Sequence, residues 1–278
     1  MRKNNCLATL LMASIISIMG SFLAFASPKT TDEAANSFRT VDSRAYKEGI
    51  YTKLRFYKDT SYDEWNDALV KLWNRTFPEC SPAEISPFYY DWDRDYHVYA
   101  ISEEEMQMFI DRQDAVEKWA LSVTKNIIPD NSNRDVAVQE AFSYLASNFY
   151  YDCAATEQQE LLNQAQGAYY LITNGKGVCA SFSKAFRALV ESIPFDPGTG
   201  KVSWECATPF FIQVAIVRNN KHEWAAIQDT DGTWYHYDAS TCSSYGQKWG
   251  EWRYFHVAEK DLHDSFYNGV YENPSWYY

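Results

Sequence analysis

Basic residues are scarce in this sequence. Lysine and arginine together number 25, against 37 aspartate and glutamate residues, and the formal net charge is −12. Binding to nucleic acid or to an anionic membrane surface depends on clusters of positive charge. The charge balance therefore argues against both as partners, and it leaves the fold open.

Metal-binding patterns and repeats are also missing. The histidines and cysteines show none of the close paired spacing typical of structural zinc, and we find no internal repeat or low-complexity tract. The acidic run Asp91-x-Asp93-x-Asp95 begins like a calcium-binding loop, but Tyr96 stands where such a loop needs glycine and Ser102 where it needs glutamate. We therefore expect no metal and no cofactor.

One long apolar run stands at the N-terminus. The uncharged segment from Leu7 to Ala26 follows Arg2 and Lys3, and it ends in Ala-Phe-Ala, the small-x-small form of a signal-peptidase site. Its length is also near that of a membrane-spanning helix, so an uncleaved N-terminal anchor is the alternative. We expect residues 1–26 to be a signal peptide cleaved near Ala26, and the protein to be secreted or extracellular.

Cysteines are few, and loss of Cys6 with the leader leaves an odd number. The remaining five are Cys80, Cys153, Cys179, Cys206 and Cys242. In an oxidising compartment an odd count leaves one thiol over, often a reactive one, and Cys179 has the functional context described below. The other four could form two disulfides, although the sheet order expected below disfavours the pair Cys206–Cys242. Alternatively, all five thiols act as small buried hydrophobic residues.

Helical periodicity dominates the first part of the chain. It predicts helices over residues 61–77, 102–128, 134–149 and 157–172, and a further helix that begins at Cys179. The stretch 79–99 is rich in proline, aspartate and tyrosine, and we expect it to be irregular. We expect a mainly helical N-terminal region over residues 27–130, followed by a second domain over residues 131–278, whose family resemblance is described below.

Short strands follow the Cys179 helix. Residues 210–217, 222–228 and 234–238 have strand patterns, and the first and second links carry the turn signals Asn219-Asn220 and Asp231-Gly232. Such tight links predict an antiparallel meander, in which His222 opens one strand and Asp238 closes the next. Both residues then lie at the same end of the sheet. A helix packed on this sheet with its N-terminus toward that end would bring Cys179 to them.

These three residues are the types that a cysteine nucleophile needs. The thiolate is the attacking species, and a helix N-terminus together with an imidazolium stabilises its charge. The glycines of Gly175-Lys-Gly177 permit the tight backbone that presents Cys179 at a helix start. His222 would act as general base, and Asp238 would orient its ring. His236 shares the strand face of Asp238 and is the rival base, ranked second because it lies in mid-strand.

The same residues resemble a known family. The runs Gly-Lys-Gly-Val-Cys-Ala-x-Phe-Ser-x-Ala-Phe, His-x-Trp and Gly-x-Trp-Tyr-His-x-Asp-Ala are similar to the three motifs of the transglutaminase-like superfamily, in its exported bacterial form. Leu145–Asp152 and Tyr254–Val257 resemble its flanking segments. The resemblance covers residues 135–260. It implies an α+β fold with a papain-like core, in which the cysteine helix packs on an antiparallel sheet, and it implies Cys179, His222 and Asp238 as catalytic residues that form a thioester acyl-enzyme.

The chain departs from the family pattern at two places. Glu223 stands where members commonly have a small residue, and a carboxylate there could raise the pKa of the imidazole or restrict the substrates. The third motif continues as Ser240-Thr-Cys rather than with a Thr-Trp pair, which leaves the wall of the site open.

The sequence thus predicts an exported cysteine enzyme that acts on peptide or carboxamide bonds. Hydrolysis is favoured over amine cross-linking because nothing marks an amine-binding site. The expected partner is a protein or peptide substrate, with the cell surface and the cell wall as candidate locations. The alternative is a non-catalytic extracellular binding or adhesion module on the same fold.

Overall fold

The computed structural model describes the chain in several stretches, namely residues 51–57, 79–80, 89–93, 96–219, 222–244, 254–262 and 275–277. The expected signal peptide and the helix expected over 61–77 lie outside these stretches. The chain divides into two compact units. One comprises Met1–Leu72 and Ile85–Met108, and the other comprises Trp73–Glu84 and Phe109–Tyr278. In the described stretches, no helix combines the length and the hydropathy needed to cross a bilayer.

The first unit contains a three-stranded antiparallel sheet in the order β1-β3-β2. Its strands are β1 (Tyr51–Tyr57), β2 (Tyr89–Asp93) and β3 (Tyr96–Ser102). The expectation of irregular structure over 79–99 is therefore wrong from residue 89 onward, apart from the short link between β2 and β3. Tyrosine, tryptophan and valine favour strands, and here they outweigh the aspartates, which sequence reasoning took as loop signals.

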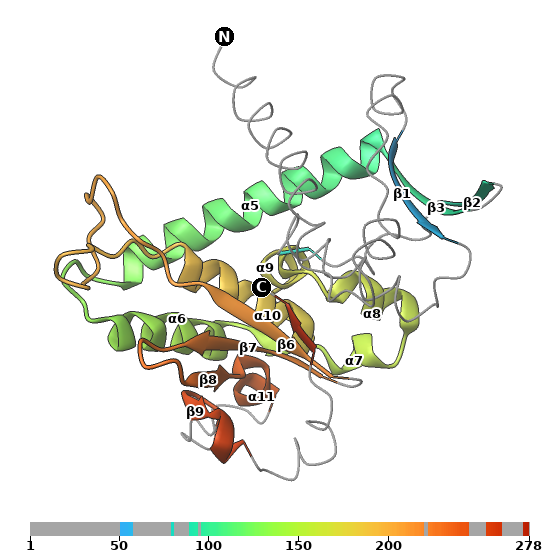
Figure 1. Ribbon diagram of the computed structural model, residues 1–278. Coiled ribbons are helices and arrows are strands. Elements are labelled where there is room, and N and C mark those ends of the chain that lie inside the picture. Colours follow the sequence, from blue (N-terminus) through green and yellow to red (C-terminus); the bar gives the residue numbers. More distant parts are fainter. Residues whose placement is uncertain are drawn as a thin grey trace. The chain divides into compact units, whose positions relative to one another are not determined.

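Helices supply most of the second unit (Figure 1). They are α5 (Glu103–Ile127), which belongs to this unit from Phe109 onward, α6 (Arg134–Asn148), α7 (Cys153–Thr156), α8 (Gln159–Ala165), α9 (Ala168–Asn174), α10 (Cys179–Glu191) and α11 (Ala239–Ser244), with a 3-10 turn η4 (Glu259–Asp261). The bounds of α5 and α6 agree with the periodicity to within two residues, and α10 begins at Cys179 as predicted. The single helix expected over 157–172 is instead two, because Gly167 adopts an extended conformation at the start of α9.

A five-stranded sheet in the order β10-β6-β7-β8-β9 forms the other layer of this unit. It consists of β6 (Val214–Arg218), β7 (Glu223–Gln228), β8 (Trp234–Tyr237), β9 (Val257–Ala258) and β10 (Ser275–Tyr277). All neighbouring strands are antiparallel, so the meander predicted for β6, β7 and β8 is confirmed. The turn between β7 and β8 contains Gly232, whose φ of 86° is readily adopted only by glycine.

The two faces of this sheet carry different parts of the core. Ala225 and Ile227 of β7 belong to the main cluster, which also contains Phe182 and Phe186 of α10. Trp224 and Ala226 alternate with them and join a smaller cluster on the opposite face. Figure 1 shows α10 lying along the sheet, and nearly every residue of this helix is buried. The expected α+β fold, with the cysteine helix packed on an antiparallel sheet, is therefore confirmed.

A short parallel pair leads the chain into α10. Strand β4 (Tyr150–Tyr151) pairs with β5 (Lys176–Gly177), so that Tyr151 lies opposite Gly177. The backbone N–H of Asp152 extends the pairing by donating to the carbonyl of Gly177 at 2.8 Å. This pair fixes the backbone immediately before Cys179.

Candidate active site

Cys179 is the first residue of α10, as the sequence predicts. Val178 precedes it as an extended N-cap residue that provides no capping side chain, so the first backbone N–H groups of the helix have no capping partner from that position. The side chain of Cys179 is half-buried and its thiol is free. The positive end of a thirteen-residue helix thus lies at a reduced sulfur.

The two glycines before Cys179 have separate roles. Gly175 ends α9 in the left-handed conformation with φ 69°, which an L side chain adopts only with strain. A Cβ on Gly177 would lie 2.2 Å from the Oγ of Ser181 and 2.9 Å from a methyl of Leu171. Gly177 is therefore required because the first turn of α10 folds back directly over it.

His222 and Asp238 lie together at one end of the sheet. His222 directly precedes β7, Asp238 directly follows β8, and the Nε2 of His222 is 2.6 Å from the Oδ2 of Asp238. Both side chains are buried. Asn219 holds the backbone at this end, since its Oδ1 accepts from the N–H of His222 at 2.8 Å and its N–H donates to the carbonyl of His222 at 3.0 Å.

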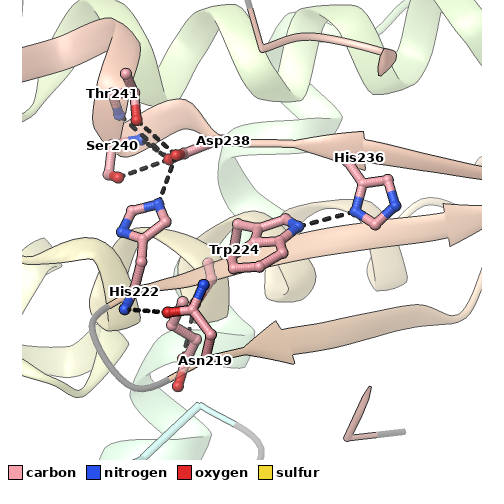
Figure 2. Close-up of polar contacts among 9 residues, drawn as sticks. Asn219, His222, Trp224, His236, Asp238, Ser240 and Thr241 are labelled. Carbon is pink, nitrogen blue, oxygen red and sulfur yellow. Dashed lines mark hydrogen bonds and ion pairs between the residues drawn. The ribbon is translucent and has the colours of Figure 1, made fainter. Parts of the chain in front are cut away.

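The carboxylate of Asp238 is surrounded by donors in addition to His222 (Figure 2). The hydroxyl of Ser240 donates to Oδ1 at 2.6 Å, and the hydroxyl of Thr241 donates to Oδ2 at 2.5 Å. The backbone N–H groups of the same two residues donate to Oδ1. Burial acts to raise the pKa of Asp238, but His222 and these hydroxyls outweigh it and lower the pKa below its ordinary value. Ser240 and Thr241 thus act together with His222 to keep the carboxyl group of Asp238 ionised.

The charge state of His222 follows from its neighbours. Burial acts to lower the pKa of His222, but the carboxylate of Asp238 and the adjacent Cys179 outweigh burial and raise the pKa to about 10. The ring also stacks on Trp224, with the ring centres 5.7 Å apart. The imidazole is therefore protonated at neutral pH, between a carboxylate and a thiol.

His236, the rival base, has a different environment. Its Nδ1 accepts a hydrogen bond from the indole N–H of Trp224 at 2.8 Å. Burial lowers the pKa of His236 to about 4, so this ring is neutral at physiological pH. Figure 2 shows Trp224 lying between His236 and His222. The structure therefore brings His222, and not His236, to Asp238 and Cys179.

Sequence reasoning gave no role to Tyr151, which the structure brings to the thiol. Its ring packs against the cluster of Ala155, Ala165, Val178 and Ala180, and the last two of these flank Cys179 in the chain. The pKa of Tyr151 is raised, first by burial and next by the neighbouring Cys179. The only signal in the sequence was that Tyr151 falls in a segment resembling a family motif, and this gave no indication of its function.

Asp152 secures the strand that carries Tyr151. Its carboxylate is buried and lies 3.0 Å from the ammonium of Lys176 on β5, and it also accepts from the hydroxyl of Tyr170 at 3.2 Å. Burial acts to raise the pKa of Asp152, but these partners outweigh burial and lower the pKa. The ion pair thus ties β4 to the strand that leads into α10.

Glu223 turns away from His222. Its carboxylate contacts Ser183 and Lys184 of α10 instead, and the groups that shift the pKa of the imidazole are Asp238 and Cys179. The suggestion that Glu223 raises the pKa of His222 thus finds no support in these contacts.

In the described part of the chain, the other cysteines and the potential metal ligands form neither the expected pair of disulfides nor a metal site. Cys153 and Cys206 are free thiols, so the alternative in which Cys80, Cys153, Cys206 and Cys242 form two disulfides is wrong. Within the stretches that the structure describes, no group of three histidine, cysteine or acidic side chains is arranged to hold a metal ion.

Comparison with known proteins identifies one family. Residues 121–239, somewhat under half of the chain, match the model of the transglutaminase-like superfamily. Cys179, His222, Asp238 and Tyr151 all lie inside the matched range. No curated protein matches the chain.

Proposed function

Since residues 121–239 form a transglutaminase-like superfamily domain, we propose that this chain is an exported cysteine enzyme that cleaves peptide or carboxamide bonds through a thioester. Cys179 is the nucleophile, His222 the acid and base, and Asp238 the residue that orients His222. The observation that carries the proposal is the buried 2.6 Å contact between His222 and Asp238, formed next to a free thiol at a helix N-terminus.

The first half-reaction starts with the proton on His222. The thiolate of Cys179 attacks the carbonyl carbon, and the oxygen becomes an oxyanion. Backbone N–H groups in the first turn of α10 can donate to that oxygen. When the intermediate collapses, the C–N bond breaks and the proton on His222 passes to the leaving amine. The product is a thioester on Cys179 and a neutral imidazole.

The second half-reaction regenerates the thiolate. Neutral His222 takes a proton from water as the water oxygen attacks the thioester, and the C–S bond breaks to release a carboxylic acid. An amine in place of water would give a new amide, which is cross-linking. We favour water because neither the sequence nor the described side chains mark a site for an amine.

Tyr151 supports the same chemistry from β4. Its hydroxyl lies next to Cys179, and its raised pKa keeps the phenol protonated and able to donate a hydrogen bond. A neutral donor beside the sulfur is suited to stabilising the oxyanion as it forms.

The substrate class and the location of the reaction are part of the proposal. The expected substrate is a protein or peptide outside the cell, reached after cleavage near Ala26. The net charge of −12 makes an acidic polymer such as nucleic acid an unsuitable partner.

The decisive experiment measures thiol reactivity, so it requires no knowledge of the substrate. The purified protein is treated with iodoacetamide from pH 5 to 10, and labelling of each cysteine is followed by mass spectrometry. Cys153 is exposed and serves as the internal reference. We expect Cys179 to label at pH 6, where a free cysteine, with a pKa of about 8.5, is largely unreactive.

Two further variants separate an enzyme from a binding module. Cys179→Ser should abolish any acyl-enzyme formed with a chromogenic ester, whereas Cys153→Ser should leave it unchanged. Parallel labelling of Cys179 and Cys153 at every pH would contradict the proposal and favour the non-catalytic alternative.

A further inference from the structure

A buried ion pair connects the helix that carries Cys179 to the strand that follows His222. The Nζ of Lys184 on α10 lies 2.6 Å from the Oε1 of Glu223, the first residue of β7. The hydroxyl of Ser183 donates to the same oxygen at 2.9 Å. The Lys184 and Glu223 side chains are only 3% and 9% exposed.

The position of this pair relative to the site is specific. Glu223 is covalently adjacent to His222, and Lys184 lies little more than one helical turn after Cys179. Glu223 shares its strand face with Ala225, which packs in the main core, whereas Trp224 lies on the opposite face. The carboxylate of Glu223 thus links α10 to the start of β7, which directly follows His222.

A contribution to folding alone explains this pair poorly. Burying two charges costs solvation, and the attraction between them often does no more than offset that cost. An apolar pair of similar volume at the same place would hold the helix to the sheet equally well. What the ion pair adds is directional: a charged hydrogen bond fixes the distance and the angle between two groups, which apolar contacts do not.

We propose that Lys184 and Glu223 are positioning residues that set the separation between the Cys179 thiol and the His222 imidazole. The inference rests on the proposed function, because it matters only if those two groups exchange a proton. Neither residue touches the reacting atoms. Their effect is transmitted through α10 on one side and through the start of β7 on the other.

The groups that face the thiol and the imidazole limit what a change at Glu223 can do. Asp238 contacts the imidazole from the end of β8, and Tyr151 approaches the thiol from β4. Neither of these two residues is substituted in the Glu223 variants. A change in thiol reactivity would therefore report the distance between Cys179 and His222, provided that the charge of Glu223 is controlled for.

The experiment separates side-chain length from charge. Glu223→Asp keeps the charge but withdraws the carboxylate by one methylene, whereas Glu223→Gln keeps the length and an oxygen that can accept from Ser183 and Lys184. The readout is the pH dependence of iodoacetamide labelling at Cys179. We expect Glu223→Asp to slow labelling at pH 6 by about tenfold, which corresponds to a midpoint about one pH unit higher. Glu223→Gln should stay within twofold of the unmodified protein.

A double variant and a matched control complete the set. Lys184→Met with Glu223→Leu removes both charges, so no unpaired charge is left buried, and it should slow labelling as Glu223→Asp does while the protein remains folded by circular dichroism. The control is Arg134→Met with Asp229→Asn. It breaks another ion pair between elements, at 2.9 Å, just beyond the opposite end of β7, and it should leave labelling unchanged. If the double variant does not fold, the comparison of Glu223→Asp with Glu223→Gln is sufficient to test the positioning role.

Each failure has its own pattern. Equal labelling rates in the unmodified protein, Glu223→Asp and Glu223→Gln would overturn the positioning role and leave the proposed function standing. A larger effect of Glu223→Gln than of Glu223→Asp would assign the effect to charge and likewise overturn it. Labelling of Cys179 in the unmodified protein only near pH 8.5 would overturn the proposed function, and this inference with it.

Discussion

At the residue scale, Asp238 has the most demanding environment in the site. It is buried, ionised and bonded to His222, Ser240 and Thr241, so each of its oxygens has at least two partners. A carboxylate so bound cannot rotate, and it holds the imidazole of His222 in one orientation. In the proposed mechanism, Asp238 fixes the ring and balances the charge of the imidazolium.

Replacing Asp238 by Asn should therefore damage chemistry more than binding. The amide has the same shape, but its NH2 group can only donate. In either orientation of the amide, this group faces a donor, so the hydrogen bond from His222 or the one from the Ser240 hydroxyl is lost. We expect Asp238→Asn to lower the rate of acyl-enzyme formation by about 10²–10⁴-fold. Stopped-flow measurement with a chromogenic ester would check this. A loss below tenfold would show that Asp238 does not orient His222.

The pKa of His222 predicts a pH dependence of stability. A histidine whose folded-state pKa is about 10, against about 6.5 when unfolded, binds its proton more tightly in the folded state. Its contribution is fully present below pH 6.5 and is lost as the pH rises toward 10. The contribution of Asp238, whose pKa is lowered, is present above about pH 4 and is lost on acidification.

Urea unfolding of His222→Gln and of the unmodified protein tests this dependence. The difference in the free energy of unfolding should be about 3 kcal/mol near pH 6, because the variant leaves a buried carboxylate without its cation. It should shrink steadily between pH 7 and pH 10. A difference that stays constant over that range would show that His222 is not held as an imidazolium in the folded protein.

These residues also show how far sequence reasoning reaches. Cys179, His222 and Asp238 were identified because each begins or follows a predicted element, and the meander places two of those ends together. Tyr151 was missed because it reaches the thiol through a two-residue parallel pairing that has no local signature. The hydroxyls around Asp238 were noted only as a departure from the family pattern, since their partner becomes clear only when the chain is folded.

At the element scale, the start of α10 depends on close approach at Gly177. An alanine there would place its Cβ 2.2 Å from the Oγ of Ser181, which itself donates to the carbonyl of Val178 at 2.9 Å. The serine cannot move away without giving up that bond. The overlap would therefore push the first turn of the helix, and Cys179 with it.

Gly177→Ala should cost about 2 kcal/mol in the free energy of unfolding, as overpacking of a tight core does. It should also reduce the labelling of Cys179 at pH 6. Adding Ser181→Ala removes the atom that clashes and should recover about half of the lost stability, as measured by urea unfolding. No recovery in the double variant would show that Leu171, and not Ser181, limits the space at Gly177.

The elements that were predicted poorly failed for identifiable reasons. Periodicity continues through residues 157–172, but Gly167 allows an extended residue between α8 and α9, and no apolar pattern reports such a break. In residues 89–99, aspartates among the aromatic residues predict irregular structure, whereas β2 pairs with β3 and β3 pairs with β1. These residues form strands because they pair with other segments, one of which is distant in sequence. The residue pattern of a single segment gives no information about such pairing.

At the scale of the whole molecule, α5 belongs to the packing of the transglutaminase-like domain. Val116, Ala120 and Ile128 are fully or almost fully buried and belong to the same cluster as Phe142 and Phe186. The segment before α5 contributes as well, since the N–H of Ala168 donates to the carbonyl of Glu79 at 2.8 Å. The boundary expected from the sequence, between residues 130 and 131, would separate these groups from the rest of their core.

Truncation therefore provides a test of where the domain begins. Within the described stretches, a chain that starts at residue 131 loses five buried apolar residues, namely Cys80, Phe109, Val116, Ala120 and Ile128. The larger ones contribute about 1.5–3 kcal/mol each, a loss comparable to the whole stability of a typical domain. We expect this chain to lack cooperative thermal unfolding, whereas a chain that starts at residue 73 should unfold cooperatively and label at Cys179 at pH 6. Cooperative unfolding of the shorter chain would support the boundary at 130 and would show that the transglutaminase-like domain folds without α5.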